Sequence, residues 1–115
     1  MKKEEKVAYV KNLLAAVKNR AEKDDAASAC LQTCEGHTLS RFNTIACIMQ
    51  KPDVSLVGGF QQWRAKGRIV RKGERGFTIF FPCFKKNEET GEEALAYFRT
   101  ATVFDISQTE PLKKD

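Results

Sequence analysis

The stretch WRAKGRIVRKGERGFTIFF, residues 63–81, contains the change from helical to extended patterning that decides the fold. Up to Gly67, apolar residues recur every three or four positions, as they do on one face of a helix. Beyond it, residues 69–71 predict a short strand, and residues 72–76 a turn whose glycines supply positive φ. Residues 77–81 are β-branched and aromatic and predict a second strand. The stretch therefore predicts a β-hairpin that follows a helix.

Helical patterning also dominates the start of the chain. An amphipathic helix with lysines on its other faces is predicted over residues 3–22, because the apolar residues share one face: Val7, Val10, Leu14, Val17 and Ala21. This stripe most simply packs on the domain's own core, and docking on a partner is the alternative. Residues 24–34 are alanine-rich and predict a short second helix that begins near Asp24 or Asp25.

Two further helices are predicted between Gly36 and Gly67. Ser40 is suited to cap a helix that Pro52 stops, with apolar positions at Phe42, Ile45, Ala46 and Met49. Asp53 then offers an N-cap for a helix that Gly67 closes, carrying Leu56, Phe60 and Trp63. We expect Phe42, Phe60 and Phe80 to lie in the core.

The C-terminal third returns to extended patterning. Residues 85–93 form a polar loop, and residues 97–104 alternate as a strand. The predicted class is α+β, with three or four helices packed on one side of a small antiparallel sheet of about three strands. At 115 residues the chain fits one domain, divided into an N-terminal helical segment (1–39), a core (40–109) and a frayed tail or linker stump (110–115).

Positive charge is concentrated in one part of the chain. The net charge is +5, but residues 51–86 hold nine lysines and arginines against two acidic residues, whereas residues 87–115 hold three against seven. A basic block beside aromatic residues indicates a nucleic-acid partner, although such blocks are often only solvated faces. No apolar run reaches the roughly 20 residues of a membrane span, and no signal peptide is evident, so a soluble cytoplasmic protein is predicted.

Most catalytic motifs are absent from the sequence. With His37 as its single histidine, the chain cannot form the HExxH zinc site of a metalloprotease, and it has no phosphate-binding glycine loop. The pattern Cys30-x3-Cys34-x2-His37 lacks the tight Cys-x2-Cys arms of a zinc site. We expect these two cysteines, Cys47 and Cys83 to be reduced, small hydrophobic residues. No enzymatic activity, metal or cofactor is predicted.

Three motifs carry a resemblance to a known family. They are Trp63-x3-Gly67-x2-Val70-x-Lys72-Gly73-Glu74-x-Gly76, the run Ser40-Arg41-Phe42-Asn43 that opens a helix ending in Gln50, and the closing run Val103-Phe104-Asp105-Ile106-x-Gln108-Thr109. Over residues 40–109 the chain resembles the N-terminal domain of ArdC-type antirestriction proteins. The resemblance implies a sequence-tolerant single-stranded DNA-binding domain, which the family joins to a zinc metalloprotease-like domain and which plasmids and other mobile elements carry. It gives no basis for proteolysis in these residues, and it leaves room for a separate protease-like or restriction-related partner.

A sequence-tolerant binder needs cations that follow the phosphates and flat side chains on which bases stack. The cations near the helix-to-hairpin junction are expected to line a groove with Arg41. Asn43 is expected to contact a base edge or a local backbone group, and Trp63 to be a core residue or a stacking platform. The predicted DNA-binding residues are Arg41, Asn43, Trp63, Arg64, Lys66, Arg68, Arg71, Lys72, Lys85, Lys86, Tyr97 and Arg99. The alternatives are a protein-interaction module that uses the basic face, and an RNA binder.

Overall fold

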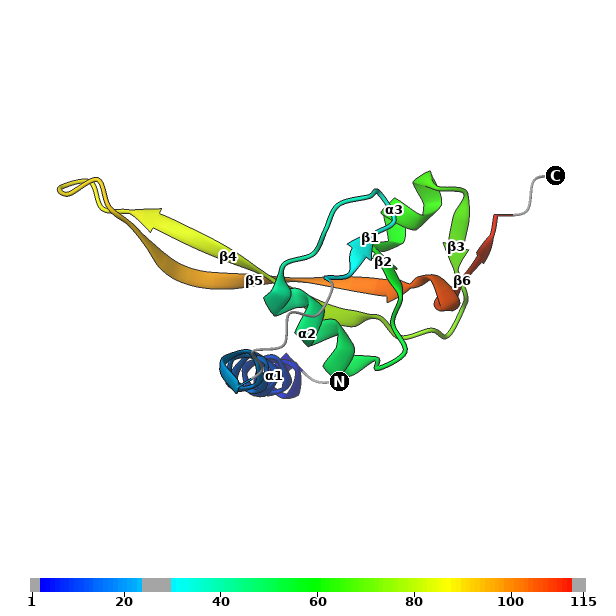
Figure 1. Ribbon diagram of the computed structural model, residues 1–115, viewed down its shortest axis with the longest axis horizontal. Helices are drawn as coiled ribbons and strands as arrows, with labels where there is room; N and C mark the ends of the chain where they lie inside the picture. The colour runs from blue at the N-terminus through cyan, green and yellow to red at the C-terminus, as the bar shows by residue number, and fades with distance from the viewer. Residues whose placement is uncertain (1–2, 24–29, 113–115) are drawn as a thin grey trace.

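The computed structural model of the chain describes residues 3–23 and 30–112 (Figure 1). Its helices are α1 (Lys3–Lys23), α2 (Arg41–Gln50), α3 (Phe60–Ala65) and the short 3-10 helix η1 (Ile106–Gln108). Its strands are β1 (Gln32–Thr33), β2 (Leu56–Gly58), β3 (Arg68–Val70), β4 (Phe77–Lys86), β5 (Glu93–Asp105) and β6 (Thr109–Pro111). No helix among these residues is long and apolar enough to cross a membrane.

The strands form a four-stranded sheet in the order β1-β2-β5-β4 and a separate two-stranded sheet of β3 and β6. The fold is α+β, as predicted, but the sheet is mixed, because β1 and β2 pair in parallel while the other pairs are antiparallel. The expected hairpin between residues 69–71 and 77–81 is wrong. β4 instead pairs with β5 over ten register positions, and β3 pairs with β6 near the C-terminus.

Two of the predicted helices also need correction. In the segment 24–34, residues 24–29 lie outside the described part of the chain, and Gln32–Thr33 form strand β1. Asp53 does not cap a helix, since residues 56–58 form strand β2 and α3 begins only at Phe60, after Gly59. Val57 is fully buried when β2 pairs with β5, and burial of this apolar strand outweighs the helical spacing. Gly58 fits because a Cβ there would lie 2.7 Å from Cys34 Sγ and 3.0 Å from the Trp63 ring.

The amphipathic helix α1 is confirmed, and its stripe packs on the domain itself. Val17 is fully buried with Ile45 and Ala46 of α2 and with Phe80 of β4. Beside them Phe42, Phe80 and Phe98 form a ring cluster with centroids 5.9 to 6.3 Å apart. This cluster fixes α1 and α2 against one face of the β4–β5 hairpin.

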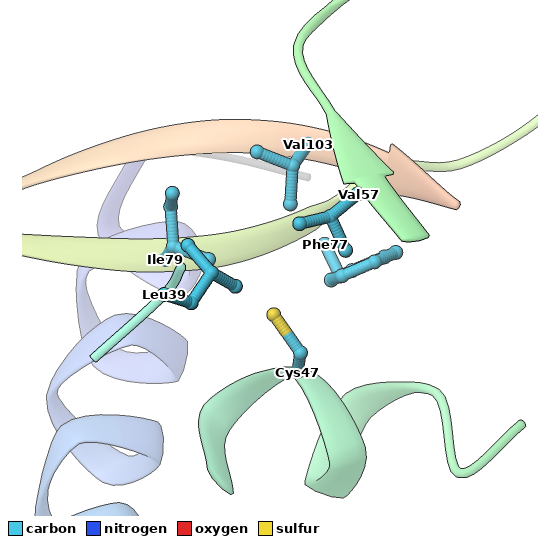
Figure 2. Close-up of a cluster of buried hydrophobic side chains, with 6 residues drawn as sticks. All are labelled: Leu39, Cys47, Val57, Phe77, Ile79 and Val103. Carbon is cyan, nitrogen blue, oxygen red and sulfur yellow. The ribbon is translucent and has the colours of Figure 1, made fainter. Parts of the chain in front are cut away.

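A second apolar cluster lies on the other face of β4 (Figure 2). It contains Leu39, Cys47, Val57, Phe77, Ile79 and Val103. Cys47 points from α2 toward the strand side chains, and burial raises the pKa of its thiol to about 12. It therefore acts as a small hydrophobic residue, as expected. Because successive side chains of a strand point to opposite faces, Phe77 and Ile79 of β4 join this cluster and Phe80 joins the cluster beside α1.

Helix α2 covers the outer edge of β4 through two amide side chains. Asn43 Nδ2 donates to the carbonyl of Phe80 and its Oδ1 accepts from the same residue's N–H, both at 2.8 Å. Two turns later Gln50 does the same to Thr78, at 2.7 and 2.8 Å. Pro82, which has no N–H to offer, follows at the next outward-facing position of β4. These amides therefore satisfy backbone groups that a neighbouring strand would otherwise pair.

Past α1 and α2 the two long strands continue as a two-stranded ribbon; we call residues 81–99 the hairpin arm (Figure 1). It accounts for the elongated shape, 58 Å by 33 Å by 33 Å. A register shift between Cys83 and Phe84 bends it. At the other end Glu110 and Pro111 pair with β3, so residues placed in a frayed tail belong to a strand.

Candidate nucleic-acid interface

The predicted DNA-binding residues do not lie in one groove. Arg64, Lys66 and Lys72 belong to α3 and the turns around β3, at the end of the molecule opposite the hairpin arm (Figure 1). Lys85 and Lys86 lie near the arm's tip, and Arg41 begins α2 between these ends. The structure therefore separates the expected groove into distinct surfaces.

Trp63 is a core residue and not a stacking platform. Its side chain is 2% exposed, and Nε1 donates to the carbonyl of Phe104 at 3.0 Å. Phe60 is the opposite case: expected in the core, it is 42% exposed. The reason is that α3 begins at Phe60, so the apolar spacing from Leu56 does not run through one helix.

Asn43 cannot contact a base edge, because it is buried and both its amide atoms bind the Phe80 backbone. Asn43 does bind a backbone group, as one of the two expectations had it, but this group belongs to Phe80 on β4 and not to the start of its own helix. The local cap at this position is made instead by Ser40 Oγ, which accepts from the Asn43 N–H.

Two predicted phosphate ligands are held in structural contacts. Arg68 donates through Nε to Thr109 Oγ1 at 2.7 Å and through NH2 to the Thr109 carbonyl. Arg71 donates to the Ser107 carbonyl at 2.6 Å and pairs with Glu74 at 3.0 Å. Hydrogen bonds from Arg71 and then Gln108 lower the pKa of Glu74. Both arginines therefore join β3 and its turn to the C-terminal segment.

The tip of the hairpin arm is acidic. Lys85 and Lys86 share residues 85–93 with Glu88, Glu89, Glu92 and Glu93, and Lys86 lies opposite Glu93 in the strand register. Two lysines against four glutamates give a surface that repels phosphates. These lysines are therefore poor candidates.

The base of the arm, by contrast, presents aromatic and cationic side chains together. Phe81 lies directly opposite Arg99, and Tyr97 opposite Cys83, so all four share one face of the hairpin. Phe81 is 47% and Tyr97 57% exposed, and Arg99 is exposed with no side-chain partner among residues 3–23 and 30–112. We call Phe81, Tyr97 and Arg99 the arm patch. Tyr97 and Arg99 were among the predicted DNA-binding residues. Phe81 was not, because alternation places its side chain on the same face of β4 as the buried Phe77 and Ile79.

A groove of about 580 Å³ adjoins the arm patch, and we call it the sheet groove. Phe81, Ile79 and Val103 of the hairpin line it, facing the loop that carries His37 and Thr38. Ser40 and Phe42 also line it, and the exposed Arg41 lies between them in sequence. Among the predicted cations, Arg41 is therefore the one whose sequence neighbours line this groove.

The described residues contain no group of three or more His, Cys, Asp or Glu side chains placed to hold a metal ion. Cys30, Cys34, Cys47 and Cys83 are free thiols. Burial, and then the nearby Glu35 carboxylate, raise the pKa of Cys34. A neutral thiol is a weak nucleophile, so this cysteine offers no activated group.

Comparison with known proteins identifies what the chain is similar to. The sequence model of one family, described as the N-terminal domain of anti-restriction factor ArdC, matches residues 3–104. No curated protein sequence matches significantly. The metal-free crystal structure of the antirestriction protein ArdC from the R388 plasmid is 23% identical with a TM-score of 0.56, covering 90% of this chain and 42% of that chain. Its Mn(II)-bound structure is 20% identical with a TM-score of 0.57, covering 88% and 40%. The chain thus shares their fold and spans about two-fifths of their length.

Proposed function

Since the chain belongs to the family of N-terminal domains of the anti-restriction factor ArdC, we propose that it is a sequence-tolerant single-stranded DNA-binding module. It acts by binding and not by catalysis, and it serves an antirestriction protein of a plasmid or another mobile element. A protease-like or restriction-related protein is the partner with which it works.

The arm patch is the observation that carries this proposal. Phe81 and Tyr97 are exposed rings on one face of the hairpin, and Arg99 lies opposite Phe81 and two residues from Tyr97 on β5. Bases stack on such rings whatever their sequence, and a neighbouring guanidinium binds the phosphates between them. The sheet groove begins at Phe81, and Ser40 and Phe42, which also line it, flank the exposed Arg41 in sequence, so Arg41 is the candidate for a second cation.

The arrangement of exposed side chains supports the proposed sequence tolerance. Base identity is read by hydrogen bonds to base edges, whereas phosphate contacts and stacking carry little sequence information. The two amides that α2 presents to the hairpin, Asn43 and Gln50, bind the β4 backbone and so do not read a base edge. The exposed residues of the arm patch are therefore those that bind any base.

The test is fluorescence anisotropy of labelled single-stranded DNA of mixed sequence, with duplex DNA and RNA as competitors, at two salt concentrations. Phe81→Ala should weaken binding by about 5- to 150-fold, the range of one lost stacked base. Arg99→Ala should weaken it and flatten the salt dependence by the equivalent of about one phosphate. Phe84→Ala is the matched control, an exposed ring on the acidic half of the arm, and should change little.

Three results would count against the proposal. Wild-type protein that binds no single strand at low salt removes DNA binding altogether. Equal losses for Phe81→Ala and Phe84→Ala move the site away from the arm patch. Tighter binding of RNA than of DNA changes the ligand to RNA.

A second candidate function rests on the opposite end of the molecule. Arg64, Lys66 and Lys72 are exposed there, far from the arm patch (Figure 1). This surface suits an acidic protein, such as a restriction-related partner. Replacing the three residues with Ala should leave single-strand binding within about twofold if they serve a protein, and weaken it with a flatter salt slope if they bind phosphates.

A further inference from the structure

A second groove lies on the other face of the hairpin, between α1 and β5. It has a volume of about 680 Å³ and is lined by Lys3, Lys6, Val7, Val10, Lys11 and Leu14 of α1 and by Phe80, Phe98 and Thr100 of the hairpin. Tyr97 also lines it, although alternation along β5 places this residue with Phe81 and Arg99, so its side chain lies at the border between the two faces. We call it the helix groove. Phe80 pairs with Thr100 and the next residue, Phe81, with Arg99, so the two pairs point to opposite faces. The helix groove and the sheet groove therefore flank the same section of the hairpin.

The helix groove combines an apolar floor with three lysines of α1, Lys3, Lys6 and Lys11, while Glu4 and Glu5 of the same helix do not line it. None of Lys3, Lys6 and Lys11 forms an ion pair with another described residue, and no carboxylate lines the groove. Two turns after Lys11, Lys18 Nζ lies 5.5 Å from the centroid of the Phe98 ring and adds to these lysines. Val7 remains 46% exposed beside the lysines. A ligand that fits is a polyanion with flat, weakly polar groups.

The edge of β5 leaves a path between the two grooves. β2 pairs only with Phe104 and Asp105 of β5, so β5 has no strand neighbour on that side at Thr100. Because Thr78 and Phe80 direct their backbone groups toward α2, their β5 partners direct theirs away from β4, toward this open edge. Phe80 and Phe98 line both grooves. A chain that leaves the arm patch can therefore cross the edge near Thr100 and enter the helix groove.

We infer that the helix groove is a second binding site for the single strand held at the arm patch, with Lys6 and Lys11 binding its phosphates and Tyr97 contacting its bases at the junction. This inference rests on the proposed function. A strand that occupies both sites is longer than one that occupies the arm patch alone. The two sites are therefore separable by oligonucleotide length.

The experiment compares labelled oligothymidylates of about 5 and about 15 nucleotides, within the range that single-strand binding domains cover. The double variant Lys6→Ala/Lys11→Ala should bind the long oligonucleotide at least about tenfold more weakly, with a salt slope smaller by about 1.4, and bind the short one as wild type does. Arg20→Ala/Lys86→Ala removes the same charge outside both grooves and should leave both affinities within about twofold. Because alanine favours helices, α1 should persist, and thermal unfolding checks this.

Each other outcome decides against the inference in a distinguishable way. If both double variants weaken both lengths equally, only overall charge matters and the helix groove is not a site. If polyglutamate displaces the long oligonucleotide as well as unlabelled oligothymidylate of equal charge does, the groove binds an acidic polypeptide instead. If neither oligonucleotide binds the wild-type protein, the proposed single-strand binding is itself wrong. If Phe81→Ala leaves binding of the short oligonucleotide intact, the arm patch is not the binding site, and the inference that rests on it is wrong as well.

Discussion

At the scale of single residues, Asp105 joins three segments that are distant in sequence. One carboxylate oxygen accepts from the N–H groups of Ser55 and Leu56 at 2.8 and 3.1 Å, and the other accepts from the N–H and the hydroxyl of Ser107. Gln108 Oε1 in turn accepts from the Asp105 N–H. The buried carboxylate thus fixes the start of β2 and the turn into η1 against the end of β5.

The pH dependence of stability should follow from this carboxylate. Burial raises the pKa of Asp105, but the hydrogen bonds from Ser107, Ser55 and Leu56 outweigh it, and the pKa lies below its usual value. A carboxyl with a depressed pKa in the folded state stabilises the fold above its unfolded pKa of about 4, and this stabilisation is lost as the pH falls through the folded value.

Asp105→Asn should therefore lower the free energy of unfolding by about 1–3 kcal/mol at pH 7, because the amide group faces donors where the carboxylate accepted. The difference from wild type should shrink below about pH 4. Urea unfolding between pH 7 and pH 2.5 measures both, with Glu89→Gln at the exposed arm tip as the control. A difference that is constant with pH would show that the carboxylate charge is not what stabilises this junction.

At the scale of elements, sequence patterns located the long helices and strands but not their partners. The apolar stripe located α1 and the capping residue Ser40 located the start of α2, since each of these signals lies within or next to the element that it predicts. Strands β1, β2, β3 and β6 have two or three residues each, too few to show alternation, and their pairing depends on contacts distant in sequence. Alternation along β5 likewise predicted that Tyr97 and Arg99 share an exposed face, while Arg68 and Arg71, whose partners are distant in sequence, were mistaken for free cations.

The α2–β4 contact gives a prediction at this scale. Asn43→Ala should cost about 2–5 kcal/mol, because the buried N–H and carbonyl of Phe80 both lose their partner. In native-state hydrogen exchange it should release the Phe80 amide more than the Thr78 amide. Gln50→Ala should do the reverse and serves as the matched control. Equal release of both amides in each variant would mean that α2 protects β4 only as a unit.

At the scale of the whole molecule, charge and stability both vary along the long axis. The acidic arm tip lies at one end and the cations of α3 and the β3 turns lie at the other (Figure 1). Both core clusters lie on the side of the arm base toward the helices, and residues 84–95 are exposed throughout. A two-stranded ribbon without a covered face contributes little to global stability.

Removing residues 84–96 and joining Cys83 to its register partner Tyr97 through an Asn-Gly turn should therefore lower the free energy of unfolding by only about 1 kcal/mol. Because four glutamates leave with two lysines, single-strand affinity at low salt should rise by about two- to fivefold. Thermal unfolding and anisotropy measure the two effects. A loss of binding would assign the bases to the tip and not to the arm patch.

The amides of Asn43 and Gln50 have a consequence for how this domain can diversify. They contact β4 only through its main chain, so the docking of α2 does not depend on which side chains the strand carries at its exposed positions. Under the proposed function, substitutions at Phe81, Cys83, Tyr97 and Arg99 should change ligand preference while the scaffold stays the same. The main chain of β4 anchors α2, whereas the proposed recognition depends on exposed side chains of β4 and β5, so these four positions are the natural place to randomise the domain for new ligands.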